Sequence, residues 1–378
     1  MPAFIRGYGL TKVGEHWAEN LEDLAVQACL QAIDRANIEP EKIDKIYIAN
    51  ALGQYFNRKT NIGAAIADAL GIPAKGGITI EAAGASGGLA VHQAFIDIKA
   101  GARNILVCGV EKMSDALPSY VYSAKAMMED WQYLFAVGAS FEALQGILLR
   151  MYLDQYNAPH ENIMMVAVVS HKHAVTAEHA QFRREITVDT IKKSPLVADP
   201  LHLFEITAPG DGAAALVLSS ETGDSEILAS SIAGDRFRFF ERENPLWLDS
   251  VYLAAQKAYE EAKLTLDDID LIEIHDTSTI LGVLEIEALG LAEKGEGHKF
   301  FSEGKGFLNG EKPVNTFGGA KARGDPIGAT GVYQIVEIVK QLVGDAGKNQ
   351  VDNAKAGLAL AVGGIGALSV VHILRKVK

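Results

Sequence analysis

The sequence has little cysteine, no long apolar run and an excess of negative charge. Cys29 and Cys108, its two cysteines, each lie in an apolar periodic segment, which predicts buried thiols and excludes a disulfide framework or a cysteine-based zinc site. That cysteine usage leads us to expect a cytoplasmic protein. Because no run of about 18 apolar residues occurs, we expect no membrane span, and the first residues lack a signal peptide's apolar core. A formal net charge of −13 argues against a general nucleic-acid binder.

Aliphatic residues and glycine, by contrast, are plentiful. The 378 residues are 48% hydrophobic and 22% charged, so the chain can bury a large core, and its length suits two fused halves. Two stretches, 32–51 and 258–277, align without a gap. Each has the pattern of a helix, a short polar turn containing the letters ID, and an alternating strand. We interpret them as copies of one duplicated unit.

The repeat continues more loosely through the rest of both halves. Residues 78–101 and 313–342 each have the pattern of a strand, a glycine-rich turn and a helix. Strands alternating with helices predict parallel, buried sheets covered by helices. One segment has no counterpart in the second half, and a strand at 212–220 resumes the first half after it. We therefore predict a first half (1–116 plus 207–224), an inserted domain (117–206) and a second half (225–378).

The stretch TIEAAGASGGLA, residues 79–90, predicts a strand that turns sharply into a helix. A helix N-terminus carries unpaired N–H groups and about half a positive charge, which favours an anion or a thiolate. The residue at the turn is Gly84, so this natural position for a nucleophile holds no side chain.

Several motifs together carry a family resemblance: IEAAGASGGLA, GVEKMS, DGAAALVL, EIHDTST, GGAKARGDPIGATG and AVGGIGALSVVHIL. Their order resembles the thiolase superfamily, in particular the sterol-carrier-type thiolases and their archaeal relatives. The resemblance covers essentially the whole chain. It implies an α/β thiolase fold, with duplicated halves in a five-layered αβαβα arrangement and an inserted loop domain. It also implies a homodimer or tetramer, a coenzyme A thioester as substrate or ligand, and possible association with a small OB-fold, zinc-ribbon protein.

The same resemblance assigns the catalytic positions. Thiolases place an acyl group on a cysteine that a histidine activates, and hydrogen-bond donors hold the developing oxyanions. Here the nucleophile position falls on Gly84, the histidine of the usual GHP motif falls on Asp325, and the HD histidine is kept as His275. Ser86 is a nucleophile or caps backbone N–H groups. Asp276 either fixes the tautomer of His275 or caps the next helix.

Residue type also leaves alternatives at the other positions. Asp325 is a poorer base than histidine unless burial raises its pKa, and it is either an acid/base group or a turn residue. His275 either donates to a thioester oxygen or is structural. The remaining candidates for binding coenzyme A lie at the glycine-rich turns and in a basic cluster that could equally be a solvated face: Ser86, Gly328, Ala329, Gly364, Arg183 and Arg184. The histidines of the insertion fit no metal-binding spacing.

Three functions remain open. The first is an acyl-CoA enzyme with altered chemistry, a retro-aldol cleavage or a decarboxylation that uses His275 and Asp325. The second is a non-catalytic partner subunit of an acyl-CoA-handling complex. The third is a cysteine-to-glycine change made to trap a substrate, against which Asp325 argues, since one substitution does not explain two losses. In each case cysteine-based thiolysis is not expected, and acyl chain length stays unassigned.

Overall fold

The strands form where the alternating apolar segments were expected. The computed structural model describes residues 1–377. The main strands are β1 (Phe4–Leu10), β2 (Lys45–Ala49), β3 (Gly77–Ile80), β4 (Asn104–Glu111), β7 (Gly212–Ser219), β8 (Ser225–Gly234), β9 (Leu271–Glu273), β10 (Ala356–Gly363) and β11 (Leu368–Lys376). They are ordered β3-β2-β4-β7-β1-β8-β11-β10-β9, while β5 (Leu196–Ala198) and β6 (Leu201–His202) form a separate pair.

The helices follow the amphipathic segments between these strands. They are α1 (Leu21–Ala36), α2 (Gly53–Phe56), α3 (Ile62–Ala69), α4 (Ser86–Lys99), α5 (Pro118–Lys125), α6 (Trp131–Leu134), α7 (Phe141–Tyr156), α8 (His160–Ala174), α9 (Val188–Lys192), α10 (Asp249–Ala262), α11 (Thr279–Ala288), α12 (Gly297–Ser302), α13 (Gly319–Arg323) and α14 (Thr330–Val343).

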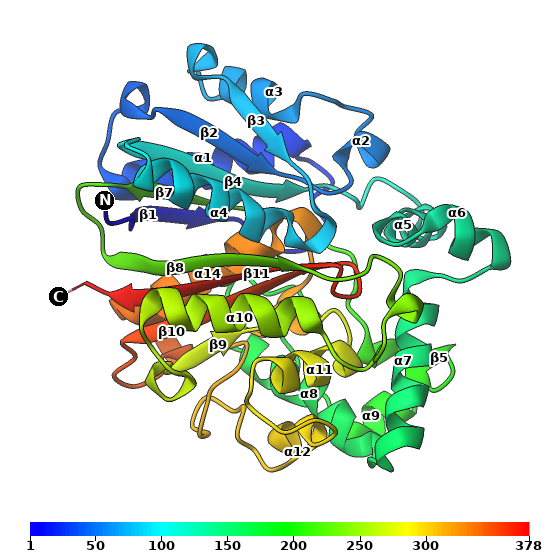
Figure 1. Ribbon diagram of the computed structural model, residues 1–378. Helices are drawn as coiled ribbons and strands as arrows, with labels where there is room; N and C mark the ends of the chain where they lie inside the picture. Colours follow the sequence, from blue (N-terminus) through cyan, green and yellow to red (C-terminus); the bar gives the residue numbers. More distant parts are fainter. Residues whose placement is uncertain (378) are drawn as a thin grey trace.

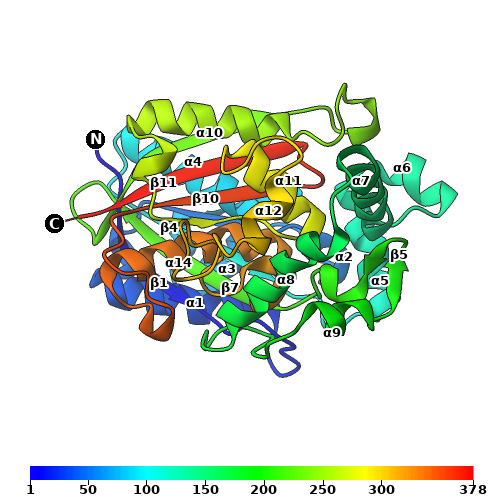
Figure 2. The same cartoon turned by 90° about the horizontal axis from the view of Figure 1, so that it is seen from below.

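Helices and half-sheets stack in five layers (Figures 1 and 2). The strands β3 to β1 form one half-sheet and β8 to β9 the other. The two are joined where Phe4 and Ile5 of β1 pair with Glu226 and Ser225 of β8. Helices α4 and α14 contact strands of both half-sheets, α1 packs on the outer side of the first, and α10 packs on the outer side of the second. The expected αβαβα arrangement is confirmed.

The duplicated unit has the same local structure in both halves. Helix α1 and helix α10 both end at a residue in the left-handed conformation, Asn37 with φ 50° and Lys263 with φ 55°. A short 3-10 helix follows in each copy, and then β2 or β9. A left-handed residue is a common way to end a helix, and it turns the chain toward the sheet here at equivalent positions of the repeat.

The prediction of parallel sheets is only partly right. Strand β2 runs parallel to β3 and β4, and β9 runs parallel to β10, but β4–β7, β1–β7, β8–β11 and β10–β11 are antiparallel. A turn of four residues joins β10 to β11, which is too short for the crossover that parallel strands need. Residues 313–316, expected as a strand, form only an isolated bridge between Val314 and Ile272.

The segment predicted as an insertion, 117–206, carries α5 to α9 and the β5–β6 pair. It lies beside the stacked layers, along one edge of the view in Figure 1. The division of the chain into domains stays a prediction. Cys29 and Cys108 are both buried and free, as expected. Among residues 1–377, no helix has the length and apolar character that crossing a membrane requires.

Candidate functional site

The glycine-rich turn between β3 and α4 is strained and closely hydrogen-bonded. Ala83 has φ 50°, a left-handed conformation that alanine rarely adopts. The buried Ser86 hydroxyl donates to the Ala83 carbonyl at 2.6 Å and accepts from the Ala82 N–H at 2.8 Å. The Ser86 hydroxyl therefore stabilises the turn by hydrogen bonds to its backbone, which favours a structural role over that of a nucleophile.

Gly84, the middle residue of this turn, has no space for a side chain. A Cβ added to it would lie 2.5 Å from the Val362 carbonyl oxygen and 2.7 Å from His275 Cε1, well inside van der Waals contact. The end of β10 and the imidazole ring therefore cover the position at which the resemblance expects a nucleophile.

His275 follows β9 and is buried, with 1% of its surface exposed. Its Nδ1 accepts a hydrogen bond from the Val362 N–H at 2.9 Å, so the neutral ring carries its proton on Nε2. Among the residues that the structure describes, Nε2 has no hydrogen-bond partner, and Asp325 Oδ1 lies 3.9 Å from it. A buried N–H without a partner is costly, so this group is a candidate donor to a ligand oxygen.

Both expectations for Asp276 are wrong. Its carboxylate accepts from Ser170 Oγ at 3.0 Å and lies 3.4 Å from the Lys321 N–H, so it does not orient His275. The tautomer of His275 is instead fixed by a backbone N–H, and the Ser278 side chain caps α11 by accepting from the Leu281 N–H. Burial raises the pKa of Asp276 to about 6.

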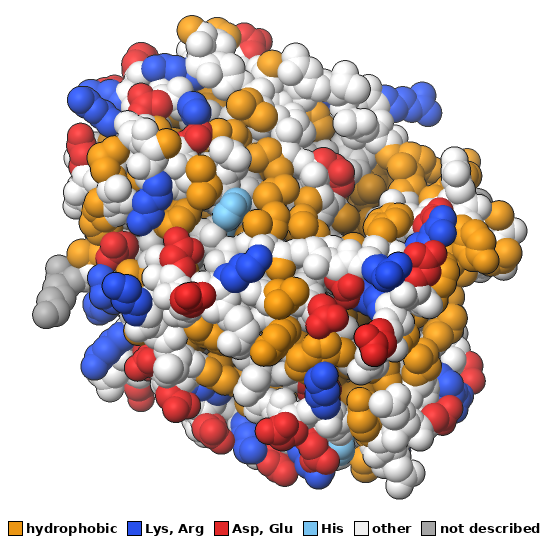
Figure 3. Space-filling view, in the orientation of Figure 1, with side chains coloured by type: hydrophobic (Ala, Val, Ile, Leu, Met, Phe, Trp, Pro, Cys, Tyr) orange, Lys and Arg blue, Asp and Glu red, His pale blue; other side chains and the backbone are white. Residues whose placement is uncertain are grey.

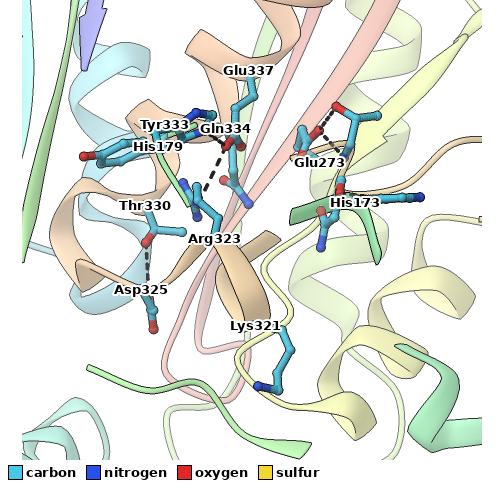
Figure 4. Close-up of polar contacts among 12 residues, drawn as sticks. His173, His179, Glu273, Lys321, Arg323, Asp325, Thr330, Tyr333, Gln334 and Glu337 are labelled. Atoms are coloured by element: carbon cyan, nitrogen blue, oxygen red, sulfur yellow. Dashed lines mark hydrogen bonds and ion pairs between the residues drawn. The ribbon is translucent and has the colours of Figure 1, made fainter. Parts of the chain in front are cut away.

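Asp325 lies in the turn between α13 and α14, and its side chain is aimed toward His275. Its Oδ1 accepts a hydrogen bond from Thr330 Oγ1 at 2.7 Å (Figure 4). Burial alone would raise the pKa of this carboxyl group, but the His275 ring, the Thr330 hydroxyl and the Lys125 ammonium outweigh it and lower the pKa. Asp325 is therefore a buried carboxylate at neutral pH. Lys125 is itself paired with Glu142 Oε1 at 2.6 Å.

Glu111, at the end of β4, is a buried carboxyl group to which no sequence motif assigned a role. Its Oε1 accepts from Asn50 Nδ2 and the Leu52 N–H, both at 3.0 Å. Its Oε2 accepts from the Ala51 N–H at 2.9 Å and the Gly328 N–H at 3.0 Å. Burial raises the pKa of Glu111 to about 7. One carboxyl group thus ties a turn of the first half to the glycine-rich turn of the second.

A cavity of about 630 Å³ extends from the surface to the turn between β3 and α4. Its volume is in the range of small-molecule sites, and its wall is mostly apolar. The wall consists of Ala51, Leu52, Gln54, Tyr55, Glu81, Ala82, Ala83, Met127, Met128, Asp235, Phe237, Gly363, Ala367 and Leu368. Two of these wall residues, Ala83 and Gly363, are the sequence neighbours of Gly84 and Val362.

The predicted coenzyme A contacts are not on the cavity wall. Gly328 and Ala329 are buried behind it, and Gly364 is adjacent to the wall residue Gly363. Arg183 and Arg184 are exposed, and the Arg183 side chain donates to the Val175 carbonyl at 3.3 Å. These contacts with coenzyme A stay predictions.

Two histidines of the insertion, His173 and His179, form hydrogen bonds with the second half. His179 Nε2 lies 2.8 Å from Glu337 Oε1, and the fully buried Arg323 is 3.7 Å from the same oxygen (Figure 4). Burial lowers the pKa of His171 and His173 to about 4 each. Within residues 1–377 no group of three or more His, Cys, Asp or Glu side chains is arranged to hold a metal ion.

The sequence matches known families along most of its length. Residues 8–222 match the family described as "Thiolase, N-terminal domain", and residues 233–376 match "Thiolase C-terminal domain-like". The chain is 37% identical to an acetyl-CoA acetyltransferase of Methanothermobacter thermautotrophicus, over 98% of this chain and 99% of that protein. It is 31% identical to sterol carrier protein 2 of Homo sapiens, over 96% of this chain and 70% of that protein.

A solved structure described as "Ltp2-ChsH2(DUF35) aldolase" has a similar fold. Its TM-score against this chain is 0.85, and the match covers 99% of this chain and 98% of that one. The sequence identity is 24%, so the likeness shows the fold alone.

Proposed function

Because the chain belongs to the thiolase family, we propose that it binds a coenzyme A thioester and cleaves or forms the carbon–carbon bond beside the thioester without a cysteine nucleophile. One observation carries this proposal. The unpartnered Nε2 of His275 and the carboxylate of Asp325 lie 3.9 Å apart, at a turn that has no room for a nucleophilic side chain.

The two groups suit a retro-aldol cleavage of a 3-hydroxyacyl thioester. Asp325, which its lowered pKa keeps ionised and able to accept a proton, takes the proton of the 3-hydroxyl group. The oxygen of that group then forms a carbonyl as the bond between C2 and C3 breaks. The electron pair of that bond becomes an enolate on the thioester, and His275 Nε2–H donates to the enolate oxygen. The proton held by Asp325 then returns to C2, which yields a shorter acyl thioester and an aldehyde or ketone.

Asp325→Asn tests this assignment. The amide keeps the shape of the side chain but cannot take a proton, so cleavage of a 3-hydroxyacyl-CoA should fall by about a hundredfold or more, within the usual range for a lost general base. Binding of the thioester, measured by calorimetry, should change little. Asp130→Asn is the matched control, since Asp130 pairs with Arg238 at the surface. Undiminished cleavage by Asp325→Asn would exclude Asp325 as the base.

A second candidate function is that of a subunit in a complex with a small OB-fold, zinc-ribbon protein. The similar aldolase structure is itself described as Ltp2 together with a ChsH2(DUF35) component. This chain also exposes large apolar side chains around α5 and α6, in the projecting region at the edge of Figure 3. They include Leu117, Tyr120, Tyr133, Val137 and Phe240.

Co-expression with a DUF35-type protein, followed by native mass spectrometry, tests the assembly. A stable complex whose formation is needed for any cleavage would support it. Migration of the chain alone, with full activity, would count against it. The same spectra measure the expected dimer or tetramer.

A further inference from the structure

The segment after α5 lines the cavity and then turns inward at a buried carboxyl group. Met127 and Met128 lie on the cavity wall, and the next residue, Glu129, is 3% exposed. Glu129 Oε1 accepts a hydrogen bond from the Ile365 N–H at 2.6 Å. The wall segment is therefore bonded directly to the turn between β10 and β11.

Arg242 also binds Ile365, through the carbonyl group of that residue. Its Nη1 donates to the Ile365 carbonyl at 2.7 Å, and its Nε lies 3.0 Å from Oδ2 of the cavity-wall residue Asp235. A buried carboxyl group and a buried guanidinium group thus bind the N–H and the C=O of one residue. We call Glu129, Ile365 and Arg242 the Ile365 clamp.

The clamp lies three residues beyond the group that orients His275. The Val362 N–H donates to His275 Nδ1, and the Val362 carbonyl lies over Gly84. Between them, Gly364 has φ 59°, and a Cβ there would lie 2.4 Å from Glu129 Oε1 and 2.8 Å from the Met128 carbonyl oxygen. Because the segment from Val362 to Ile365 is closely packed, a movement of Glu129 is transmitted along it rather than absorbed.

We propose that Glu129 and Arg242 are positioning residues that couple the cavity wall to His275. An acyl thioester in the cavity contacts Met127 and Met128, seats Glu129 against Ile365, and thereby keeps the Nε2–H of His275 aimed at the thioester oxygen. Free coenzyme A lacks the acyl group, so its affinity depends less on this coupling than the affinity of an acyl thioester does. The inference rests on the proposed function, because it takes the acyl thioester as the ligand of the cavity.

The test uses two readouts on the full chain. Nitrogen-15 NMR of the histidine rings reports the tautomer and exchange state of His275 without any ligand. Calorimetry gives the affinity for acetyl-CoA relative to free coenzyme A. Glu129→Ala should broaden or shift the His275 signal and reduce the preference for acetyl-CoA by about tenfold, the scale of one lost buried hydrogen bond.

Matched variants separate positioning from simple stabilisation. Glu129→Gln should behave like the unmodified chain, because its amide oxygen can still accept from the Ile365 N–H. Asp130→Asn, one residue away, removes a surface ion pair with Arg238 and should leave both readouts unchanged. If Glu129→Ala does not fold, Glu129→Asp, one methylene too short to reach Ile365, takes its place with the same expectation.

An unchanged His275 signal together with an unchanged ligand preference in Glu129→Ala would overturn the proposal, even if the variant melts earlier. If the unmodified chain binds no acyl thioester, the proposed function fails. The NMR comparison then still decides whether the Ile365 clamp orients His275.

Discussion

Replacing Gly84 by cysteine would restore a thiol at the position the resemblance assigns to a nucleophile, yet we expect no acyl transfer. The new Cβ would lie 2.5 Å from the Val362 carbonyl oxygen and 2.7 Å from His275 Cε1, whereas ordinary contacts begin at 3.4 Å. Overpacking of this kind typically costs about 1–3 kcal/mol. The upper half of that range applies here, because one of the two clashing atoms belongs to the backbone of β10, which is paired on both sides.

Urea unfolding of Gly84→Cys, compared with Gly14→Ala, measures this cost. A Cβ at Gly14 meets nothing within 4 Å, so that control should stay within about 0.5 kcal/mol of the unmodified chain. Intact-mass spectrometry after incubation with acetyl-CoA reports any acyl-enzyme. A Gly84→Cys variant that is as stable as the unmodified chain and carries an acetyl group would refute the reasoning.

Two further predictions concern buried polar groups. Ser86→Ala loses both hydroxyl hydrogen bonds of the strained turn and should lower the free energy of unfolding by about 1–2 kcal/mol in urea melts; a loss near zero would contradict the role given to the hydroxyl. Burial raises the pKa of Glu129 to about 7 from an ordinary 4.5, so the native state keeps a proton that the unfolded chain has lost between those pH values. The unmodified chain should therefore lose up to about 3 kcal/mol relative to Glu129→Gln as the pH rises from 4.5 to 7. A stability difference that is flat across this window would show that Glu129 titrates normally.

Much of the fold follows from the sequence because the duplication is visible in it. The constant offset between the copies extends to the left-handed residues that end α1 and α10, Asn37 and Lys263. Strand direction is harder to derive, because an alternating apolar pattern is the same in both directions. The antiparallel course of β11 depends on the length of one turn, in a run of small residues without a clear boundary.

Motif positions single out Gly84, His275 and Asp325, and the structure brings these residues together from three distant segments. Their roles stay predictions. Glu111 and Glu129 were not predictable in their roles. Their partners are backbone N–H groups of loops far away in the sequence, which leave no local pattern. The predictions for Asp276 were wrong for the same reason, because its hydrogen-bond partners lie in α8 and α13, far from it in the sequence.

The most direct test of the central claim is the mass of the product formed from a 3-hydroxyacyl-CoA in deuterated water, with no free coenzyme A added. The account predicts a shorter acyl-CoA that carries one deuterium at C2, delivered by Asp325, together with an aldehyde or ketone and no acyl adduct on the protein. No cleavage of the 3-hydroxyacyl-CoA, together with cleavage of a 3-oxoacyl-CoA only when free coenzyme A is supplied and an acyl group on the chain, would contradict it.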